Sequence, residues 1–367
     1  MPVADLGVGD GREGSPKPYQ YLLSMKCLRA PVGALRPLGI LLVAVATVAG
    51  GLGEVLANPI GSQTIALKKG WNAVAVQVDP AASAPNDVFR GLPVDKVAAY
   101  LASGTPLDYI QDPSGEPWKQ KGWRAWFSEQ SPDSFISDLS AIQSGQCYLV
   151  HATEATTLNL TGTVAHHRVS WRGDSFNMVG FPVDPDQPPT FSAWFAGSAA
   201  HQSTARTVVY QLDETDRWAP VTRPERTLIQ PDRAYWVWCQ GASDYQGPLD
   251  VIAGGARSQK VNFGDVTEVL SFKLVNNLNT PLGVLMQLSP TNGVPVLMER
   301  KLLTLSERVD VPLTESVNLG TLEPKTSRPV RLKVDRSRID GASSSAVLVL
   351  KDDVGTLLRI PVTADVP

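Results

Sequence analysis

The sequence of 367 residues is poor in the side chains that carry most catalytic and metal chemistry. It holds three cysteines and four histidines, and it lacks a Gly-rich phosphate loop, a nucleotide fingerprint and a zinc-protease helix motif. His166 and His167 have neither a cysteine nor a carboxylate beside them at the spacing of zinc ligands. We therefore expect no catalytic residue, no metal site and no cofactor.

A strong net charge is absent as well. The formal net charge of -3 at pH 7 gives no reason to expect nucleic acid as a partner. The apolar run 38–49 is shorter than the roughly 20 residues that a membrane helix needs. It follows Lys26, Arg29 and Arg36 and precedes Val55-Leu56-Ala57. A charged segment, a short apolar segment and a small-residue cleavage site in this order are typical of a secretory signal peptide.

Residues 1–57 are therefore expected to form a leader with a secretory signal peptide. The mature chain is expected to be exported to the cell envelope or exterior without a membrane span, and an uncleaved N-terminal anchor is the alternative. Met25 is better placed than Met1 as the initiator because it comes just before the charged segment. Export would leave Cys147 and Cys239 in the mature chain, where we expect two buried free thiols, with a disulfide as the alternative.

One stretch of the sequence occurs twice, at 70–80 and at 175–185. Each copy runs from a turn residue through an aromatic residue, Trp71 or Phe176, to asparagine, an apolar strand and Asp-Pro. A second landmark, Ile-Gln placed shortly before a tyrosine, follows each copy at a similar interval. These matched intervals predict two tandem copies of one small β-rich module.

We assign the two modules to residues 58–166 and 167–255. The run 73–76 is apolar without alternation, which predicts a strand covered on both faces. The other expected elements are a short helix beginning near residue 86, hairpins over 109–118 and 208–218, and closing strands over 146–152, 157–163, 234–239 and 249–252.

Residues 256–367 have a cleaner β pattern. Apolar and polar residues alternate over 270–274 and 330–335, and a hairpin signal spans 347–362. Strands at regular spacing with turns between them favour an immunoglobulin-like β-sandwich. The expected fold class is therefore mainly β, with two tandem copies of a small β-rich module followed by an immunoglobulin-like β-sandwich.

Three runs of the last third, 274–282, 322–335 and 339–362, resemble bacterial immunoglobulin-like accessory modules of the BACON type. This resemblance implies a non-catalytic part of an exported protein that contacts carbohydrate or spaces other domains. Through Gly70-Trp71-Asn72, the front modules resemble the GWN repeats of exported prokaryotic surface proteins. The second copy departs from that pattern, because Ser175-Phe176-Asn177 stands in the same place.

Aromatic residues are the best functional signal. All nine tryptophans fall in the two front modules, and the flat face of a tryptophan can stack on a sugar ring. Most of them are expected to fill the module cores. Trp123 and Trp126 follow the polar loop 119–122 and are expected to be the exposed pair, so we assign them as ligand-binding residues.

The run Arg172-Gly173-Asp174-Ser175 has three interpretations. It matches an adhesion tripeptide, it matches the start of a serine esterase, and it occupies the place of the turn 68–70 in the first module. Such an esterase needs a histidine base oriented by an aspartate, and the downstream Asp-x-x-His element that the resemblance to these esterases implies is absent. A turn is therefore the expected role.

Acidic residues gather in two turns. Asp213, Glu214 and Asp216 offer oxygen ligands for calcium, although they lack the glycine and distal glutamate of an EF-hand loop. Asp213 and Asp216, together with Asp112 and Glu116, are also the candidate acid-base groups of a hydrolase. A solvated hairpin turn is the expected structural role.

The leading functional hypothesis is an exported, non-catalytic structural or interaction protein of the cell envelope or exterior. Its partner would be a surface component, either carbohydrate or protein. One alternative is a carbohydrate-binding module protein that uses exposed tryptophans, and the second is a secreted hydrolase.

Overall fold

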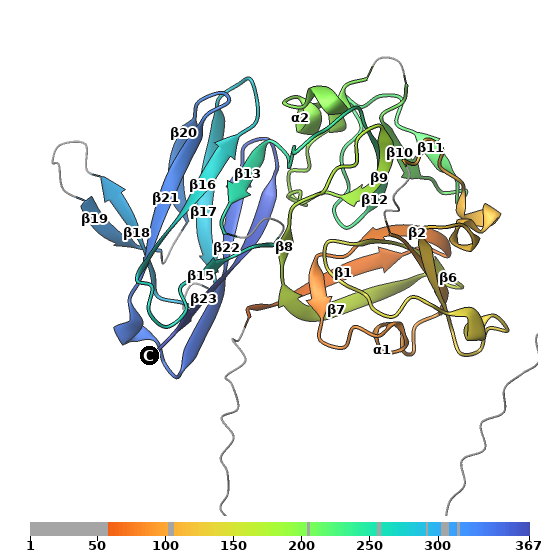
Figure 1. The fold of residues 1–367 in the computed structure, drawn as a ribbon, viewed down its shortest axis with the longest axis horizontal. Coiled ribbons are helices and arrows are strands. Elements are labelled where there is room, and N and C mark those ends of the chain that lie inside the picture. The colour runs from red at the N-terminus through yellow and green to blue at the C-terminus, as the bar shows by residue number, and fades with distance from the viewer. Residues whose placement is uncertain are drawn as a thin grey trace, which may run out of the picture. The chain divides into compact units, whose positions relative to one another are not determined.

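The computed structural model describes residues 58–101, 106–203, 206–254, 258–290, 293–301, 308–313 and 316–367. Strands dominate this part of the chain (Figure 1), so the expected mainly β fold is confirmed. The expected leader and signal peptide, residues 1–57, lie outside the described residues.

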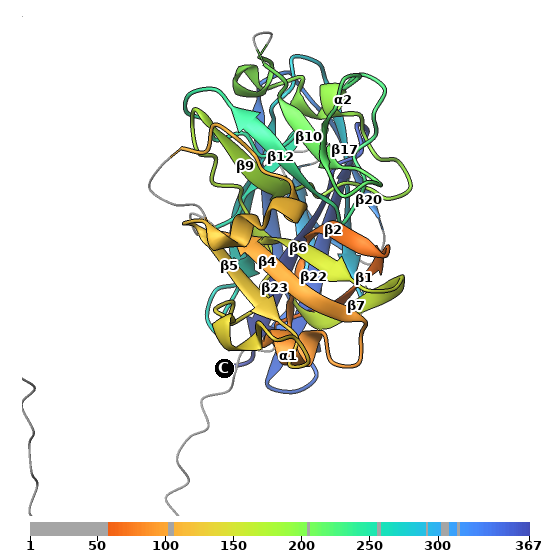
Figure 2. The same cartoon turned by 90° about the vertical axis from the view of Figure 1, so that its right-hand side faces the viewer.

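The elements of the first module are β1 (Ile60–Leu67), β2 (Gly70–Ala75), β3 (Val78–Pro80), α1 (Pro85–Val88), β4 (Val94–Tyr100), β5 (Trp123–Phe127), β6 (Cys147–Ala152) and β7 (Thr156–Val164). A four-stranded sheet has the order β2-β6-β4-β5 (Figure 2), and a three-stranded sheet has the order β1-β7-β3. Their side chains share one core that includes Ile65, Val97 and Leu158. Burial of this apolar surface is the main term that stabilises the module.

Strand β2 is covered on both faces, as its sequence predicts. Val74 belongs to the core of the first module. Ala73 and Ala75 point the opposite way and belong to a second cluster. A strand with two buried faces has a continuous apolar sequence, because neither face contacts water.

The second module repeats the larger sheet of the first. Its elements are β9 (Ser175–Gly180), α2 (Phe191–Phe195), β10 (Val209–Leu212), β11 (Trp218–Pro220) and β12 (Ala234–Cys239). The antiparallel order β9-β12-β10-β11 matches β2-β6-β4-β5 strand for strand. Trp71 and Phe176 therefore lie on corresponding edge strands, which confirms the expected two copies of one module.

Side-chain contacts are repeated along with the strands. The backbone N–H of Gln143 donates to the hydroxyl of Tyr148 over 2.8 Å, and that of Gln230 donates to the hydroxyl of Tyr235 over 2.9 Å. The two Ile-Gln landmarks therefore mark the same tyrosine contact in both copies.

The expected hairpin over 109–118 is wrong. Two 3-10 turns, Pro113–Gly115 and Pro117–Lys119, occupy that region, because each proline lacks the N–H that a strand ladder needs. Strand β5, which follows this region, pairs antiparallel with β4, which precedes it in the chain. The equivalent hairpin of the second module, β10 with β11, is confirmed.

The C-terminal part is a sandwich of two five-stranded sheets (Figure 1). One sheet contains β13 (Leu249–Ile252), β16 (Val269–Asn276), β21 (Ser327–Val334), β18 (Val296–Lys301) and β19 (Arg308–Pro312) in that order. The other contains β15 (Val261–Asn262), β23 (Leu357–Asp365), β22 (Ser343–Asp352), β17 (Leu282–Ser289) and β20 (Val317–Leu322). Phe272, Leu332 and Ile360 are among the buried residues that fill the core of the sandwich.

The expectation that 249–252 closes the second module is wrong. Strand β13 pairs with β16, and its Leu249 and Val251 lie in the core of the sandwich. This sheet gives β13 hydrogen-bond partners for its backbone and a core in which its apolar side chains are buried. The sandwich thus begins before residue 256, while the other proposed domain limits stay predictions.

The two modules share a third core made of aromatic rings. It combines Trp71, Trp118 and Trp123 of the first module with Trp218, Trp236 and Trp238 of the second. On β12, the alternate residues Tyr235 and Val237 fill the second module's own core. Each four-stranded sheet is therefore buried on both faces, which joins the modules into one packed body.

Candidate functional site

A cavity of about 1080 Å³ is lined by both modules and the sandwich. Its wall includes residues 143–147 of the first module, 176–182 of the second and 357–359 of the sandwich. The segment 165–172, which we call the connector, joins the modules and lines the cavity along its whole length. The cavity is thus created by the packing of three parts of the chain.

Contacts with two parts of the chain hold the connector in place. The strand β8 (His166–His167) pairs with β14 (Ser258–Gln259), which lies on the way into the sandwich. Val169 and Trp171 pack against the core of the second module. A wall fixed in this way keeps its polar groups in set positions around the cavity.

Arg168 forms an ion pair inside the cavity. Its Nη1 lies 2.5 Å from Oδ1 of Asp250, and the Asp250 side chain is only 8% exposed. Burial raises the pKa of Asp250, and the charge of Arg168 opposes that rise. Burial also lowers the pKa of His166 to about 4, with help from His167 and Arg168. His166 is therefore neutral at neutral pH.

Two residues of the cavity wall, Ser144 and His167, meet an aspartate, Asp79. The N–H and the hydroxyl of Ser144 both donate to Oδ1 of Asp79, over 2.8 and 2.7 Å. The Ser144 hydroxyl oxygen also lies 2.8 Å from Nε2 of His167. A hydroxyl has one proton, so while Asp79 accepts it, His167 must donate to the oxygen. This is the reverse of the proton transfer that activates a nucleophilic serine.

The expected exposure of Trp123 and Trp126 is wrong. They are 9% and 7% exposed. Trp126 stacks on Phe89 at 5.5 Å between ring centroids and Trp123 lies 6.3 Å from Trp236. The second module covers one ring and the first module's own core covers the other. Neither ring has a free face of the kind that a stacked sugar needs.

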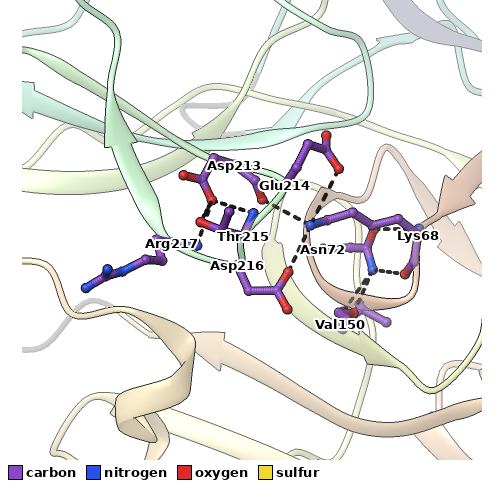
Figure 3. Close-up of polar contacts among 9 residues, drawn as sticks. Lys68, Asn72, Val150, Asp213, Glu214, Thr215, Asp216 and Arg217 are labelled. Atoms are coloured by element: carbon purple, nitrogen blue, oxygen red, sulfur yellow. Dashed lines mark hydrogen bonds and ion pairs between the residues drawn. The ribbon is translucent and has the colours of Figure 1, made fainter.

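The acidic turn of the second module holds a lysine of the first (Figure 3). Nζ of Lys68 donates to the carbonyl of Asp213 over 3.0 Å and to Oδ1 of Asp216 over 2.9 Å. Glu214 lies farther off, at 3.8 Å. Gly70 also lies close to this turn, because an added Cβ there would lie 2.5 Å from Oδ2 of Asp216. The lysine ammonium therefore takes the place that a bound cation would need.

We expect Lys68→Met to lower the free energy of unfolding by about 1 kcal/mol, because two charge-assisted hydrogen bonds between the modules are lost. The expected loss is small because the Lys68 side chain is 29% exposed and water screens its charge. Urea unfolding followed by circular dichroism measures the change. Lys69→Met, at an exposed neighbour, is the control and should stay within about 0.5 kcal/mol. Equal effects of the two substitutions would contradict the expectation.

The other candidate carboxylates also have structural partners. Asp112 accepts from the backbone N–H of Trp218 over 2.7 Å and from Nε of Arg217 over 3.3 Å. Glu116 pairs with Lys119 at 2.6 Å. In the described residues these groups form contacts within and between modules.

The run 172–175 is a turn, as expected. Gly173 and Asp174 lead into β9, and Asp174 has a φ of 49°. Ser175 is fully buried and its hydroxyl accepts from the N–H of Leu107 over 2.7 Å. A side chain held in this way is not available to a substrate.

Cys147 and Cys239 are buried free thiols, which confirms that expectation. Burial raises the pKa of Cys147 to about 12 and that of Cys239 to about 11. Neither is a thiolate at neutral pH, so neither is a ready nucleophile or metal ligand. No cluster of three or more histidine, cysteine or carboxylate side chains suited to a metal ion occurs in the described ranges.

Sequence reasoning missed the cavity and its polar groups. Ser144 and His167 belong to no sequence motif. Arg172 belongs to the run 172–175, for which the sequence predicted only a turn. Residues from 60 to 359 line the cavity, so no local signal could have brought them together.

No protein-family model matches this chain, and no curated protein matches it. Among solved structures, the PapD-like domain 7 of human CEP192 covers 33% of this chain and 85% of its own, with 10% identity and a TM-score of 0.21. A FixG-related protein from Vibrio parahaemolyticus covers 32% and 94%, with 12% identity and a TM-score of 0.20. The CsuC–CsuE chaperone–adhesion subunit complex of Acinetobacter baumannii covers 29% and 53%, with 15% identity and a TM-score of 0.19. Scores this low support no functional argument.

None of the helices in the described ranges combines the length and the apolar character that crossing a bilayer requires.

Proposed function

We propose that this protein is an exported, non-catalytic interaction protein of the cell envelope or exterior. Export rests on the leader, where a charged segment, an apolar run and small residues follow one another. The lack of catalysis rests on the state of the candidate groups. The acidic turn holds Lys68, and Asp112 accepts from Trp218.

The contact between Ser144 and Asp79 carries this proposal. Of all the groups in the cavity, Ser144 with His167 comes nearest to a nucleophile and its base. The Ser144 hydroxyl donates to Asp79 at 2.7 Å, so its proton is directed away from the imidazole. An aspartate that orients a catalytic histidine would instead accept from that histidine.

The packing of the modules supports an interaction role. The aromatic core shared by the two modules and the pairing of β13 with the sandwich fix the three parts together. A binding surface on a rigid body loses little conformational entropy when a partner binds. The proposed partner is a surface component, either carbohydrate or protein.

We expect a fluorophosphonate probe to leave Ser144 unlabelled in the folded protein. We also expect Ser144→Ala to lower the free energy of unfolding by about 1–2 kcal/mol, because Asp79 and His167 lose a hydrogen-bond partner. Mass spectrometry reads the labelling, and urea unfolding reads the stability. Thr153→Ala, at an exposed position, is the control for stability. Labelling of Ser144 that the substitution abolishes would overturn the proposal.

A further inference from the structure

The charged groups of the cavity do not balance. In the described part of the chain, Arg168, Arg172, Arg359 and Asp250 are the charged residues that line it. Arg168 and Asp250 neutralise each other at 2.5 Å. The charge of Arg359 acts on two nearby carboxyls, because it lowers the pKa of Asp184 and opposes the rise in the pKa of Asp232. Arg172 is therefore the lining guanidinium that no carboxylate of the described residues balances, in a protein whose formal net charge is -3.

Arg172 is the less satisfied of the two. Its Nη1 is buried and has no hydrogen-bond partner among the described residues. Arg359 is exposed at the sandwich side, where its Nη1 donates to Gln77 over 3.4 Å. A buried guanidinium nitrogen without an acceptor is costly. Because Arg172 lines the cavity, a small shift of its side chain towards an anion there would give this nitrogen a charge-assisted hydrogen bond.

The remaining polar lining suits hydroxyl groups. Gln143 and Gln146 line the cavity close to Ser144, and a side-chain amide both donates to and accepts from a hydroxyl. Apolar side chains such as Val347 and Leu358 complete the wall. The volume of about 1080 Å³ slightly exceeds the usual range of ligand sites, about 300–1,000 Å³, so more than one sugar ring can enter.

We propose that this cavity binds an anionic sugar, with Arg172 holding its carboxylate or phosphate. The planar guanidinium fork matches both oxyanions, and the amides bind the ring hydroxyls. The inference rests on the proposed function and deepens it, because it names the class of partner. It replaces the tryptophan faces expected from the sequence with a charged cavity.

Isothermal titration calorimetry on the full chain tests this proposal with matched probes. Trigalacturonic acid is compared with neutral galactotriose, and glucose 1-phosphate with glucose. We expect at least one anionic sugar to bind about tenfold or more tightly than its neutral counterpart, as one charge-assisted hydrogen bond provides. The pair that shows the difference identifies carboxylate or phosphate as the source of the charge, and binding should weaken in high salt.

Variants of Arg172 test the assignment to this residue. Arg172→Gln should lower the affinity about tenfold or more, and Arg172→Lys should lower it less because it keeps the charge but loses the fork. Arg223→Gln, at an exposed residue outside the cavity lining, should leave the affinity unchanged. Thermal melting checks the fold of each variant. If Arg172→Gln does not fold, Arg172→Lys and the comparison of charged with neutral sugars decide.

Three results would overturn the inference. The first is equal binding of charged and neutral sugars, or no binding of either. The second is an unchanged affinity in Arg172→Gln. The third is binding of inorganic phosphate or acetate alone that is as tight as binding of the anionic sugar. Chromatography of the sugar after titration separates this inference from the proposed function. Cleaved trigalacturonic acid would contradict a non-catalytic protein while leaving the binding site intact.

Discussion

Replacing Trp236 with alanine is expected to lower the free energy of unfolding by about 3–5 kcal/mol. The ring is 1% exposed and lies at the centre of the core that the two modules share. Its centroid lies 5.3 Å from that of Tyr100, 6.3 Å from that of Trp123 and 6.2 Å from that of Trp218. Truncation would therefore leave a void bordered by both modules, and their aromatic contacts would be lost together.

Urea unfolding followed by circular dichroism measures this loss. Phe135→Ala is the control, because that ring is 84% exposed and its removal should change the stability by less than about 0.5 kcal/mol. Limited proteolysis adds a second measurement, with cleavage expected to accelerate in both modules of the Trp236→Ala variant. A loss below about 1 kcal/mol would mean that the shared core contributes little to joining the modules.

The repeated module could be predicted from the sequence because its signals are local. Gly70-Trp71-Asn72 and its counterpart lie at matching distances from the tyrosines that follow them, and period and spacing survive in a single sequence. The apolar run 73–76 likewise predicted a strand with two buried faces. These features depend on neighbours along the chain, so no knowledge of distant contacts was needed.

Most of the errors concern features that depend on distant contacts, whereas the hairpin wrongly expected over 109–118 overlooked a local signal, its two prolines. Trp123 follows a polar loop, and Tyr100 of its own module and Trp236 of the second module pack against it. Strand β13 follows the second module in the chain but pairs with β16, since strand pairing is decided by available edges and not by order alone. The cavity also depends on distant contacts, because it forms where the two modules and the sandwich pack together.

Replacing Arg168 with methionine is expected to lower the free energy of unfolding by about 3 kcal/mol at pH 7. The partner, Asp250, would remain as an uncompensated charge in a site where its side chain is 8% exposed. Methionine fills much of the space of the arginine stem, so lost packing contributes little. The cost is therefore mainly electrostatic.

The loss of unfolding free energy in Arg168→Met should depend on pH, because the stranded Asp250 titrates. Burial already raises the pKa of Asp250, and Arg168 opposes that rise, so the variant should have a still higher folded-state pKa. An aspartate with a raised folded-state pKa destabilises the fold above that pKa, and the penalty disappears as the pH falls towards the unfolded value of about 3.9. The stability difference between wild type and variant should thus be largest at neutral pH and shrink on acidification.

Urea unfolding of both proteins at pH 7, 6, 5 and 4 measures that trend, and a double variant supplies the control. Arg168→Met with Asp250→Leu removes the charge that the single substitution strands, so it should recover most of the lost stability. The coupling energy from the double-mutant cycle isolates the ion pair from the packing changes. A deficit that stays constant with pH, or a double variant no more stable than the single one, would show that the pair stabilises the fold through packing and not through charge.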